Sequence, residues 1–331
     1  MQARSEIARI LAAEDHFLLT CHEDPDGDAI GSMSALGHIL RRLGKEFQLY
    51  CPGGLPQRFS WLDLPAEILQ SMHGSSPAWL VALDCGSPER LGSQVQPYLQ
   101  SLQSINIDHH QGNPEFGQLN WVEPQRSSVG EMVACLALDL ELELDNELGQ
   151  SVYLALVTDT GSFTYSNTNS STLQIAGKIL DHGLDLDRFN SQLYRQWNLP
   201  KVHAHGLAMQ KAELKLQGKV GLIAADSEVL RRSGAEAEDC EGLVSYMRQI
   251  RGVQVAASLL QQESYIKFSL RSWGEVDVSA VAARLGGGGH RNAAGGKLNL
   301  SLSQAQEQLL QALEEALLSE QQLESAVAAW N

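Results

Sequence analysis

The sequence predicts an α/β protein, in which a larger domain built on a parallel sheet with helices on both faces precedes a smaller α+β domain. In the first half of the 331 residues, short apolar runs alternate with segments whose apolar residues recur at helical spacing. Strands that alternate with helices favour a parallel sheet covered on both sides. In the second half, neighbouring apolar runs resemble an antiparallel hairpin and are followed by helical patterns. A polar stretch separates the halves, and the length allows two domains of ~100–200 residues.

The expected elements follow in chain order. In the first domain, we predict strands at 16–21, 47–50, 79–83, 104–107 and 119–122, and helices at 29–43, 147–157 and 171–181. In the second domain, we predict strands at 221–225, 253–260, 265–271 and 293–300, and helices at 276–285 and 303–328. The expected boundaries are 1–185 for the first domain, 186–215 for a helical linker and 216–331 for the second domain.

Composition and charge exclude several classes of protein. The net charge is -16, from 24 basic and 40 acidic residues, which argues against a track for long duplex nucleic acid, because such a track needs many Lys and Arg contacts to phosphates. No apolar run approaches the ~18 residues of a membrane span, and the N-terminal residues lack the apolar core of a signal peptide. The five cysteines are dispersed, without a C-x-x-C pair, and we expect reduced thiols in a cytoplasmic protein.

Acidic and histidine residues gather where predicted strands end. In an open parallel sheet, ligand sites lie beyond the carboxyl ends of the strands, so three separate strands and one buried helix are expected to bring these side chains to the same edge. The first strand is followed by His22, Asp26 and Asp28, the third by Asp84, the fourth by Asp108, His109 and His110, and the helix ends at Asp159.

Such a cluster suits divalent metal ions. Carboxylates packed together repel one another unless protons or cations compensate, and a mixture of Asp and His suits Mn²⁺. Two ions ~3.5–4 Å apart can clamp a phosphoryl centre, activate water and stabilise the leaving oxygen. The alternative is that each Asp only caps a helix or a turn.

Other metal and nucleotide motifs fit poorly. An EF-hand loop beginning at Asp24 would require Gly and Glu where Ala29 and Ala35 stand. The chain has no cysteine pairs for zinc. It also has no P-loop and no H-E-x-x-H pattern.

Four segments resemble, in order, the motifs of the DHH phosphoesterase family: HEDPDGDA, LDCGSPERLG, NIDHHQGN and VTDTGSF. The segments NWVEPQRSSVGEM and TDTGSFTYSNTNSSTLQIAGKIL resemble the nano-RNase and pAp-phosphatase branch of that family. GGGGHRNAAGG resembles the signature of the A1-type DHH-associated domain. The resemblance extends from about residue 5 to 325.

The resemblance implies two Mn²⁺ ions, with Co²⁺ or Mg²⁺ as substitutes, and a water between them as nucleophile. Asp84 would bridge both ions, and Asp108 would orient a histidine. His109 and His110 would join Asp84 in catalysis, with His110 on the substrate phosphate or the leaving oxygen. The metal ligands implied are His22 and Asp26 for one ion, Asp28, His109 and Asp159 for the other, and Asp84 for both.

The second domain offers candidates for substrate binding. Glycines 286–289 follow a predicted helix, and their open N–H groups could bind an anion, although a flexible turn is the plain alternative. The Arg271 guanidinium suits a terminal phosphate, although a surface ion pair would also explain it. The placement of FSLRS and GGGGH resembles the family's substrate-binding pair. The substrate-binding candidates are therefore Arg271, Gly287, Gly288, Gly289 and His290, with Arg126, Ser127 and Ser128 in the first domain.

The implied activity is hydrolysis of short oligoribonucleotides and linear dinucleotides such as pApA to mononucleotides, and of pAp to AMP. The second domain would hold a nucleotide end and so limit substrate length, and a homodimer is plausible in this family. Alternatives are a polyphosphate or pyrophosphate hydrolase, an exonuclease acting on long single-stranded DNA, and a nucleotide-binding sensor without activity. The acidic charge and the chain length disfavour the long-strand exonuclease.

Overall fold

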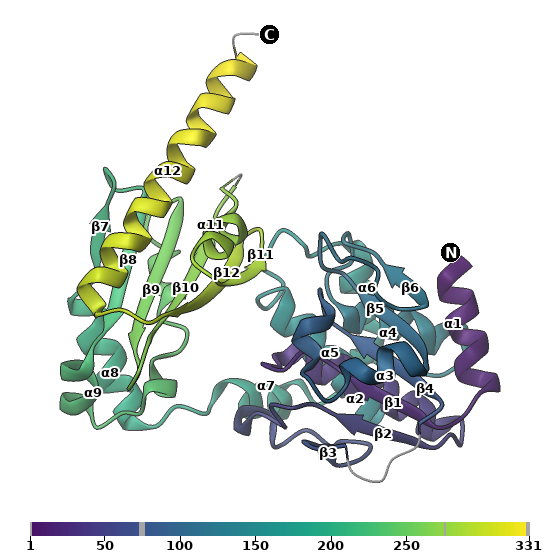
Figure 1. Cartoon of the computed structure of the whole chain (residues 1–331). Coiled ribbons are helices and arrows are strands. Elements are labelled where there is room, and N and C mark those ends of the chain that lie inside the picture. Colours follow the sequence, from purple (N-terminus) through teal and green to yellow (C-terminus); the bar gives the residue numbers. More distant parts are fainter. Residues whose placement is uncertain (1, 73–76, 275, 329–331) are drawn as a thin grey trace. The chain divides into compact units, whose positions relative to one another are not determined.

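The computed structural model describes residues 2–72, 77–274 and 276–328 and divides the chain into two compact units, Met1–Gln196 and Trp197–Asn331 (Figure 1). The division lies within the segment 186–215. That segment forms α7 (Leu186–Tyr194) at the end of the first unit and α8 (Leu199–Gln210) at the start of the second.

The first unit is built on a six-stranded sheet in the order β3-β2-β1-β4-β5-β6, and every strand pair in it is parallel. The strands are β1 (Phe17–Thr20), β2 (Phe47–Tyr50), β3 (Ile68–Leu69), β4 (Trp79–Leu83), β5 (Gln103–Asp108) and β6 (Leu119–Val122). Chain order reverses between β1 and β4, which makes their carboxyl ends the topological switch point where α/β sheets bind ligands.

Both faces of this sheet are buried, as predicted. Leu19 and Val81 pack into a core formed with most of the helices, whereas their neighbours Leu18 and Leu80 pack into a second core with Val95. Because successive strand residues point to opposite faces, these two cores lie on the two sides of the sheet. The helices are α1 (Gln2–Ala13), α2 (Gly27–Arg42), α3 (Gln96–Ser101), α4 (Val129–Asp139), α5 (Asn146–Asp159) and α6 (Ser170–Asp181).

Helix α2 packs closely against α5, and glycine allows the approach. A Cβ atom on Gly31 would lie 2.6 Å from the Ser151 carbonyl oxygen and 2.9 Å from the Ala155 nitrogen. The Ser34 and Ser151 hydroxyls hydrogen-bond at 2.9 Å across the same contact. Asp26 caps α2, since its Oδ1 accepts from the Asp28 and Ala29 amides. The first turn of α2 is therefore held at the carboxyl edge of the sheet.

The second unit is a mixed sheet in the order β11-β12-β10-β9-β8-β7, in which only β8 and β9 are parallel among the described strands. Helices α11 and α12 contribute to one core, and α8, α9 and α10 to another. The strands are β7 (Glu213–Lys215), β8 (Val220–Ala225), β9 (Val255–Gln261), β10 (Ile266–Ser272), β11 (Gly288–His290) and β12 (Ala293–Leu298). The remaining helices are α9 (Ser227–Ser233), α10 (Val244–Met247), α11 (Val278–Arg284) and α12 (Leu302–Ala328).

The glycine run of the second unit differs from the turn that we considered. Residues 288–290 form β11, which pairs with β12 at the edge of the sheet. A Cβ atom on Gly287 would lie 2.2 Å from the Gly295 carbonyl oxygen, and Gly289 has a φ of +139°. These two glycines are therefore required by the close approach of two backbone segments.

Among the residues that the structure describes, no helix combines the length and the apolar character needed to cross a bilayer.

We predict that Gly31→Ala destabilises the first unit, because the new methyl group would meet backbone atoms that cannot move away. Overpacking of this kind costs ~1–3 kcal/mol, which should appear as a lower thermal melting temperature in calorimetry. The matched control is Gly177→Ala in α6, where a Cβ atom meets nothing within 4 Å. That change should leave the melting temperature unchanged or raise it, since Ala is favoured over Gly in a helix by up to ~1 kcal/mol. Equal effects of the two substitutions would contradict the packing argument.

Candidate metal centre

The carboxyl ends of β1, β4 and β5 lie side by side. In the register of the sheet, Thr20 is opposite Ala82, and Leu83 is opposite Ile107. The residues that follow these strands therefore emerge at one edge, as predicted from the sequence. The ends of α2, α4 and α5 meet at the same edge, because Gly130 lies against Ala155 and Gly27 lies against Thr158.

Three groups of side chains at this edge could hold a metal ion. Within each group, one potential ligand atom per residue lies within 4.8 Å of the others. The structure thus brings together the predicted ligands from four segments of the chain. The groups are His22, Asp26 and Asp84; Asp28, His109 and Asp159; and Asp84, His109 and His110.

Asp84 stands between the first two groups. Its Oδ2 lies 3.7 Å from His22 Nε2, and its Oδ1 lies 3.7 Å from His109 Nε2. The residue is buried and has a φ of +52°, a left-handed conformation that is uncommon outside glycine and is often found at functional sites. Its amide donates to the Ile107 carbonyl oxygen at 3.1 Å, which fixes the turn to β5. One carboxylate thus presents each oxygen to a different histidine.

Asp28 and His109 are oriented by backbone groups. The Asp28 carboxylate accepts hydrogen bonds from the Val129 amide at 2.7 Å and the Gly130 amide at 2.9 Å, at the N-terminus of α4. His109 Nδ1 lies 3.1 Å from the Arg126 carbonyl oxygen. Because a carbonyl only accepts, Nδ1 carries the proton, and Nε2 presents its lone pair toward the carboxylates. Nε2 lies 3.7 Å from Asp28 Oδ2 and 3.8 Å from Asp159 Oδ2.

Asp108 orients His110 and belongs to none of the three groups. Its Oδ1 accepts from His110 Nδ1 at 2.7 Å, and its Oδ2 accepts from the Asn113 amide at 2.5 Å. The same amide reaches the Cys85 carbonyl oxygen, directly after Asp84. The fully buried Asp108 therefore fixes the His110 ring and directs Nε2 away from itself.

The electrostatics of the cluster fit a cation. Burial, followed by repulsion from Asp84 and Asp159, raises the pKa of Asp28 well above its usual range. Burial, with repulsion from Asp26 and Asp84, raises the pKa of Asp159 to about 7. These shifts indicate that, without a cation, burial and mutual repulsion favour protonation of the carboxylates in this cluster. Together with the His and Asp donors, this supports a divalent metal ion as the natural occupant.

Asp84 and the histidines shift in a complementary way. Burial alone would raise the pKa of Asp84, but the nearby His22, His110 and His109 hold that pKa below its ordinary value. Burial opposes protonation of His22 and His109, yet the carboxylates, Asp84 beside His22 and Asp159 beside His109, raise the pKa of both imidazoles. Of Asp28, Asp84 and Asp159, Asp84 is therefore the carboxylate that stays ionised most readily.

All three predicted substrate contacts of the first unit, Arg126, Ser127 and Ser128, have other partners in that unit. The Arg126 guanidinium pairs with Glu123 at 2.6 Å and Glu131 at 3.0 Å, so a phosphate would have to compete with two carboxylates. The Ser128 hydroxyl caps α4 by accepting from the Glu131 amide. In the second unit, Arg271 lies on β10, and its Nη1 donates to the Leu270 carbonyl oxygen at 2.8 Å. The His290 side chain lies outside the described residues.

Three residues that support the cluster were not predicted from the sequence: Asn113, Glu131 and Asn167. The Asn167 amide donates to the Asp159 carboxylate at 3.1 Å and to the Ser127 carbonyl oxygen at 2.9 Å. Neutral amides and a buried Glu carry no spacing pattern of their own. Their only signal was their location within segments that resemble the family.

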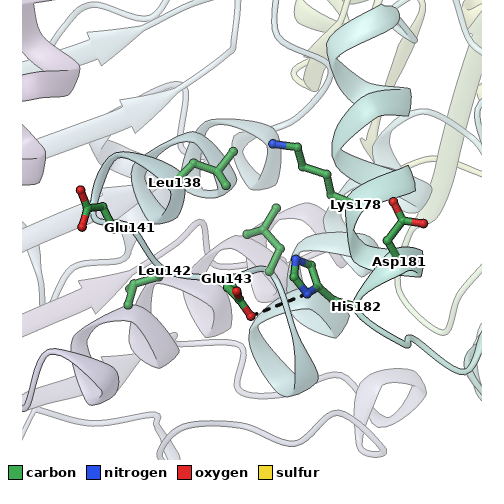
Figure 2. Close-up of a pocket in the computed structure, with 8 residues that line it drawn as sticks. Leu138, Glu141, Leu142, Glu143, Lys178, Asp181 and His182 are labelled. Atoms are coloured by element: carbon green, nitrogen blue, oxygen red, sulfur yellow. Dashed lines mark ion pairs between the residues drawn. The ribbon is translucent and has the colours of Figure 1, made fainter.

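A separate pocket of about 280 Å³ lies at the opposite end of α4. Figure 2 shows its lining from the segment after α4 and the end of α6, with His182 Nδ1 3.8 Å from Glu143 Oε2. Val129 and Gly130 at the N-terminus of α4 contact Asp28, whereas the pocket is lined near its other end by Leu138. This pocket shares no residue with the metal cluster, and the chemistry of the cluster is the stronger indication of function.

The raised pKa of Asp159 implies that the stability of the metal-free protein depends on pH. Its value of about 7 in the folded state exceeds the ~3.9 of an unfolded chain, so the folded state binds more protons between these values. The free energy of unfolding therefore falls as the pH rises from ~4 to ~7. We predict that Asp159→Asn, measured by calorimetry in EDTA, raises the melting temperature relative to wild type at pH ~7.5 and leaves it unchanged at pH ~4. The gain is a few kcal/mol at most, at ~1.4 kcal/mol for each unit of pKa shift.

The control is Asp187→Asn, whose side chain is 89% exposed, and it should match wild type at both pH values. A wild-type melting temperature that exceeds that of Asp159→Asn at pH ~7.5 would contradict the electrostatic account.

Comparisons with known proteins agree with the sequence motifs. The model described as "DHH family, N-terminal domain" matches residues 16–157, and that of the DHHA1 domain matches residues 221–319. The bifunctional oligoribonuclease and PAP phosphatase NrnA of Thermus thermophilus is 35% identical over 94% of this chain and 93% of its own length. The protein of the same name in Bacillus subtilis is 28% identical over 89% of this chain and 93% of its own.

A solved structure has the same architecture. The exopolyphosphatase-related protein from Bacteroides fragilis superposes with a TM-score of 0.87 and 25% identity, covering 95% of this chain and 96% of that one. The family models account for the segments that carry β1, β4 and β5 in the first unit and most of the sheet in the second. The chain therefore belongs to the DHH family and carries a DHHA1 domain in its second half.

Proposed function

We propose that this chain is a metal-dependent phosphoesterase that hydrolyses short oligoribonucleotides and linear dinucleotides to mononucleotides, and pAp to AMP. The observation that carries the proposal is Asp84, whose two carboxylate oxygens face His22 and His109 in two adjoining ligand groups. The choice of substrate rests on the relatives named as bifunctional oligoribonucleases and PAP phosphatases, which align along almost the entire chain.

The ligand groups suggest two ions. We assign His22, Asp26 and Asp84 to one, and Asp28, Asp84, His109 and Asp159 to the other. Bound Mn²⁺ would supply an activated water and would stabilise the leaving oxygen. The mixed Asp and His donors support Mn²⁺, and Co²⁺ or Mg²⁺ would be substitutes.

The residues of the chain have distinct roles in this proposal. Asp84 would set the spacing of the two ions, and His109 would present Nε2 to the second, since its Nδ1 faces the Arg126 carbonyl oxygen. His110 is held by Asp108 at Nδ1, and we assign its Nε2 to a phosphate oxygen or the leaving group. The arrangement needs no covalent intermediate with the protein.

In the second unit, Arg271, Gly287, Gly288, Gly289 and His290 are the proposed substrate contacts. Strand β11 is at the edge of its sheet, and an edge strand presents one row of backbone groups outward. A Cβ atom on Gly288 would meet nothing within 4 Å, which leaves room for a ligand beside this backbone. A guanidinium such as that of Arg271 would add the charge that a terminal phosphate requires.

A polyphosphate hydrolase is the second candidate. Its support is the structural similarity to a protein described as exopolyphosphatase-related. Both candidates cleave phosphorus–oxygen bonds and use the same metal cluster, so only a test of substrates can distinguish them.

We place the enzyme in the cytoplasm, consistent with five buried cysteines that form no disulfide. A homodimer stays a prediction.

A panel of substrates tests the assignment. The purified protein would be incubated with a labelled dinucleotide, a five-mer, a long single strand, pAp and polyphosphate, each with Mn²⁺ and with EDTA. We expect Mn²⁺-dependent release of mononucleotides from the short substrates and of phosphate from pAp. Hydrolysis of polyphosphate alone would favour the second candidate, and binding of metal and nucleotide without turnover on any substrate would favour the sensor.

We predict that Asp84→Ala reduces kcat/KM for the dinucleotide by on the order of 10³-fold or more, a loss of ~4 kcal/mol of transition-state stabilisation. The physical reason is that one side chain serves both ions. The control is Asp187→Asn on the surface, which should keep wild-type kinetics. Full turnover by Asp84→Ala would refute the bridging role.

A further inference from the structure

The segment 126–131 contacts two members of one ligand group directly and the third through Asn167. The Arg126 carbonyl oxygen faces His109 Nδ1 at 3.1 Å. The amides of Val129 and Gly130 donate to Asp28 at 2.7 and 2.9 Å. These contacts fix the positions of two proposed ligands from a single turn that leads into α4.

The third ligand is held through Asn167. Its amide donates to the Ser127 carbonyl oxygen at 2.9 Å and to Asp159 Oδ2 at 3.1 Å, so one side chain ties the end of α5 to the same turn. It also reaches the Asp159 carbonyl oxygen at 3.1 Å. The geometry of the whole Asp28–His109–Asp159 group therefore depends on the conformation of residues 126–131.

Glu131 holds that conformation. Its Oε2 accepts from the Ser127 amide at 3.0 Å, the Ser127 hydroxyl at 2.7 Å and the Thr172 hydroxyl at 3.2 Å, and its Oε1 accepts from Arg126 at 3.0 Å. The side chain is fully buried. Burial alone would raise the pKa of Glu131, but the hydrogen bonds from Ser127 and Arg126 bring it below its ordinary value. The carboxylate is thus an ionised centre around which the turn is folded.

The other ligand group is supported differently. Asp26 caps α2 through the Asp28 and Ala29 amides, and His22 follows β1 and faces Asp84. These contacts come from elements other than the turn at residues 126–131. A disturbance of that turn should therefore affect the two groups unequally.

We propose that Glu131 is a positioning residue for one of the two metal ions, the one held by Asp28, His109 and Asp159. The inference rests on the proposed two-metal function and assigns a role to a residue that contacts neither ion. Loss of the carboxylate frees the 126–127 turn, displaces the carbonyl partner of His109, and lowers the affinity of that site alone.

The test compares Glu131→Gln with wild type in equilibrium Mn²⁺ titrations without substrate, by calorimetry and by electron paramagnetic resonance. We expect wild type to bind two ions as an exchange-coupled pair. In Glu131→Gln, one ion should bind as in wild type and the other ~10–100-fold more weakly, as is typical for loss of a group that orients a ligand. At one equivalent, the variant should show the spectrum of uncoupled Mn²⁺.

The matched control is Glu123→Gln, which removes the other carboxylate of Arg126 and leaves Ser127 and Thr172 paired with Glu131. Two ions should bind to it with wild-type affinity. Thr172→Val removes one hydrogen bond to Glu131 and should weaken the same site by a smaller factor. This variant keeps the test decisive if Glu131→Gln does not fold.

Unchanged binding of both ions in Glu131→Gln, or equal weakening of both, would overturn the positioning role. If Glu131→Gln does not fold, unchanged binding or equal weakening in Thr172→Val would do the same. Wild type that binds fewer than two ions would instead refute the two-metal proposal itself. The two failures are therefore distinguishable in one titration series.

Discussion

Repulsion between buried carboxylates is the constraint around which the first unit is organised. Asp28, Asp84 and Asp159 share a region in which the His109 ring lies less than 4 Å from each of them. Asp28 and Asp84 are buried and Asp159 is partly buried, so water screens their charges poorly. The chain counters the repulsion with histidines and with amides at the N-terminus of α4, where the helix dipole favours negative charge. The remaining imbalance appears in the raised pKa values of Asp28 and Asp159.

The scaffold can maintain this arrangement because its supports come from the core. Strands β1, β4 and β5 are paired in register up to the residues that carry the site. Helices α2, α4 and α5 approach one another at glycines, where a side chain would collide with Ser151, Ala155 or Thr158. A site built on paired strands and packed helix ends holds its ligands more rigidly than one built on loops alone.

The architecture and the cluster could be predicted from the sequence because both depend on local patterns. Apolar runs of four to six residues, such as FLLT and WLVAL, identify strands, and the residues directly after them must share an edge if the strands are parallel. Helix α4 escaped prediction because it is apolar on nearly all sides, with nine of its eleven residues buried, and shows little amphipathic period. Strand β3 has only two residues, too few for any period.

The supports of the site could not be predicted for a different reason. Glu131 contacts Ser127, 4 residues away, and Thr172, 41 residues away, and Asn167 contacts Ser127, 40 residues away. No pattern in the local sequence predicts these contacts. Arg126 suggested a phosphate contact, yet its guanidinium is engaged by Glu123 and Glu131. The glycines before His290 suggested an anion nest, yet part of that run pairs with β12. In each case the folded chain makes a contact that the local sequence does not predict, and the substrate contact stays a prediction.

The most direct test of this account is a crystal structure grown with Mn²⁺, with anomalous scattering measured at the manganese absorption edge. We predict two anomalous peaks, one on each side of the Asp84 carboxylate, with His22 beside one and His109 beside the other. A single peak, or peaks that Asp84 does not bridge, would contradict it.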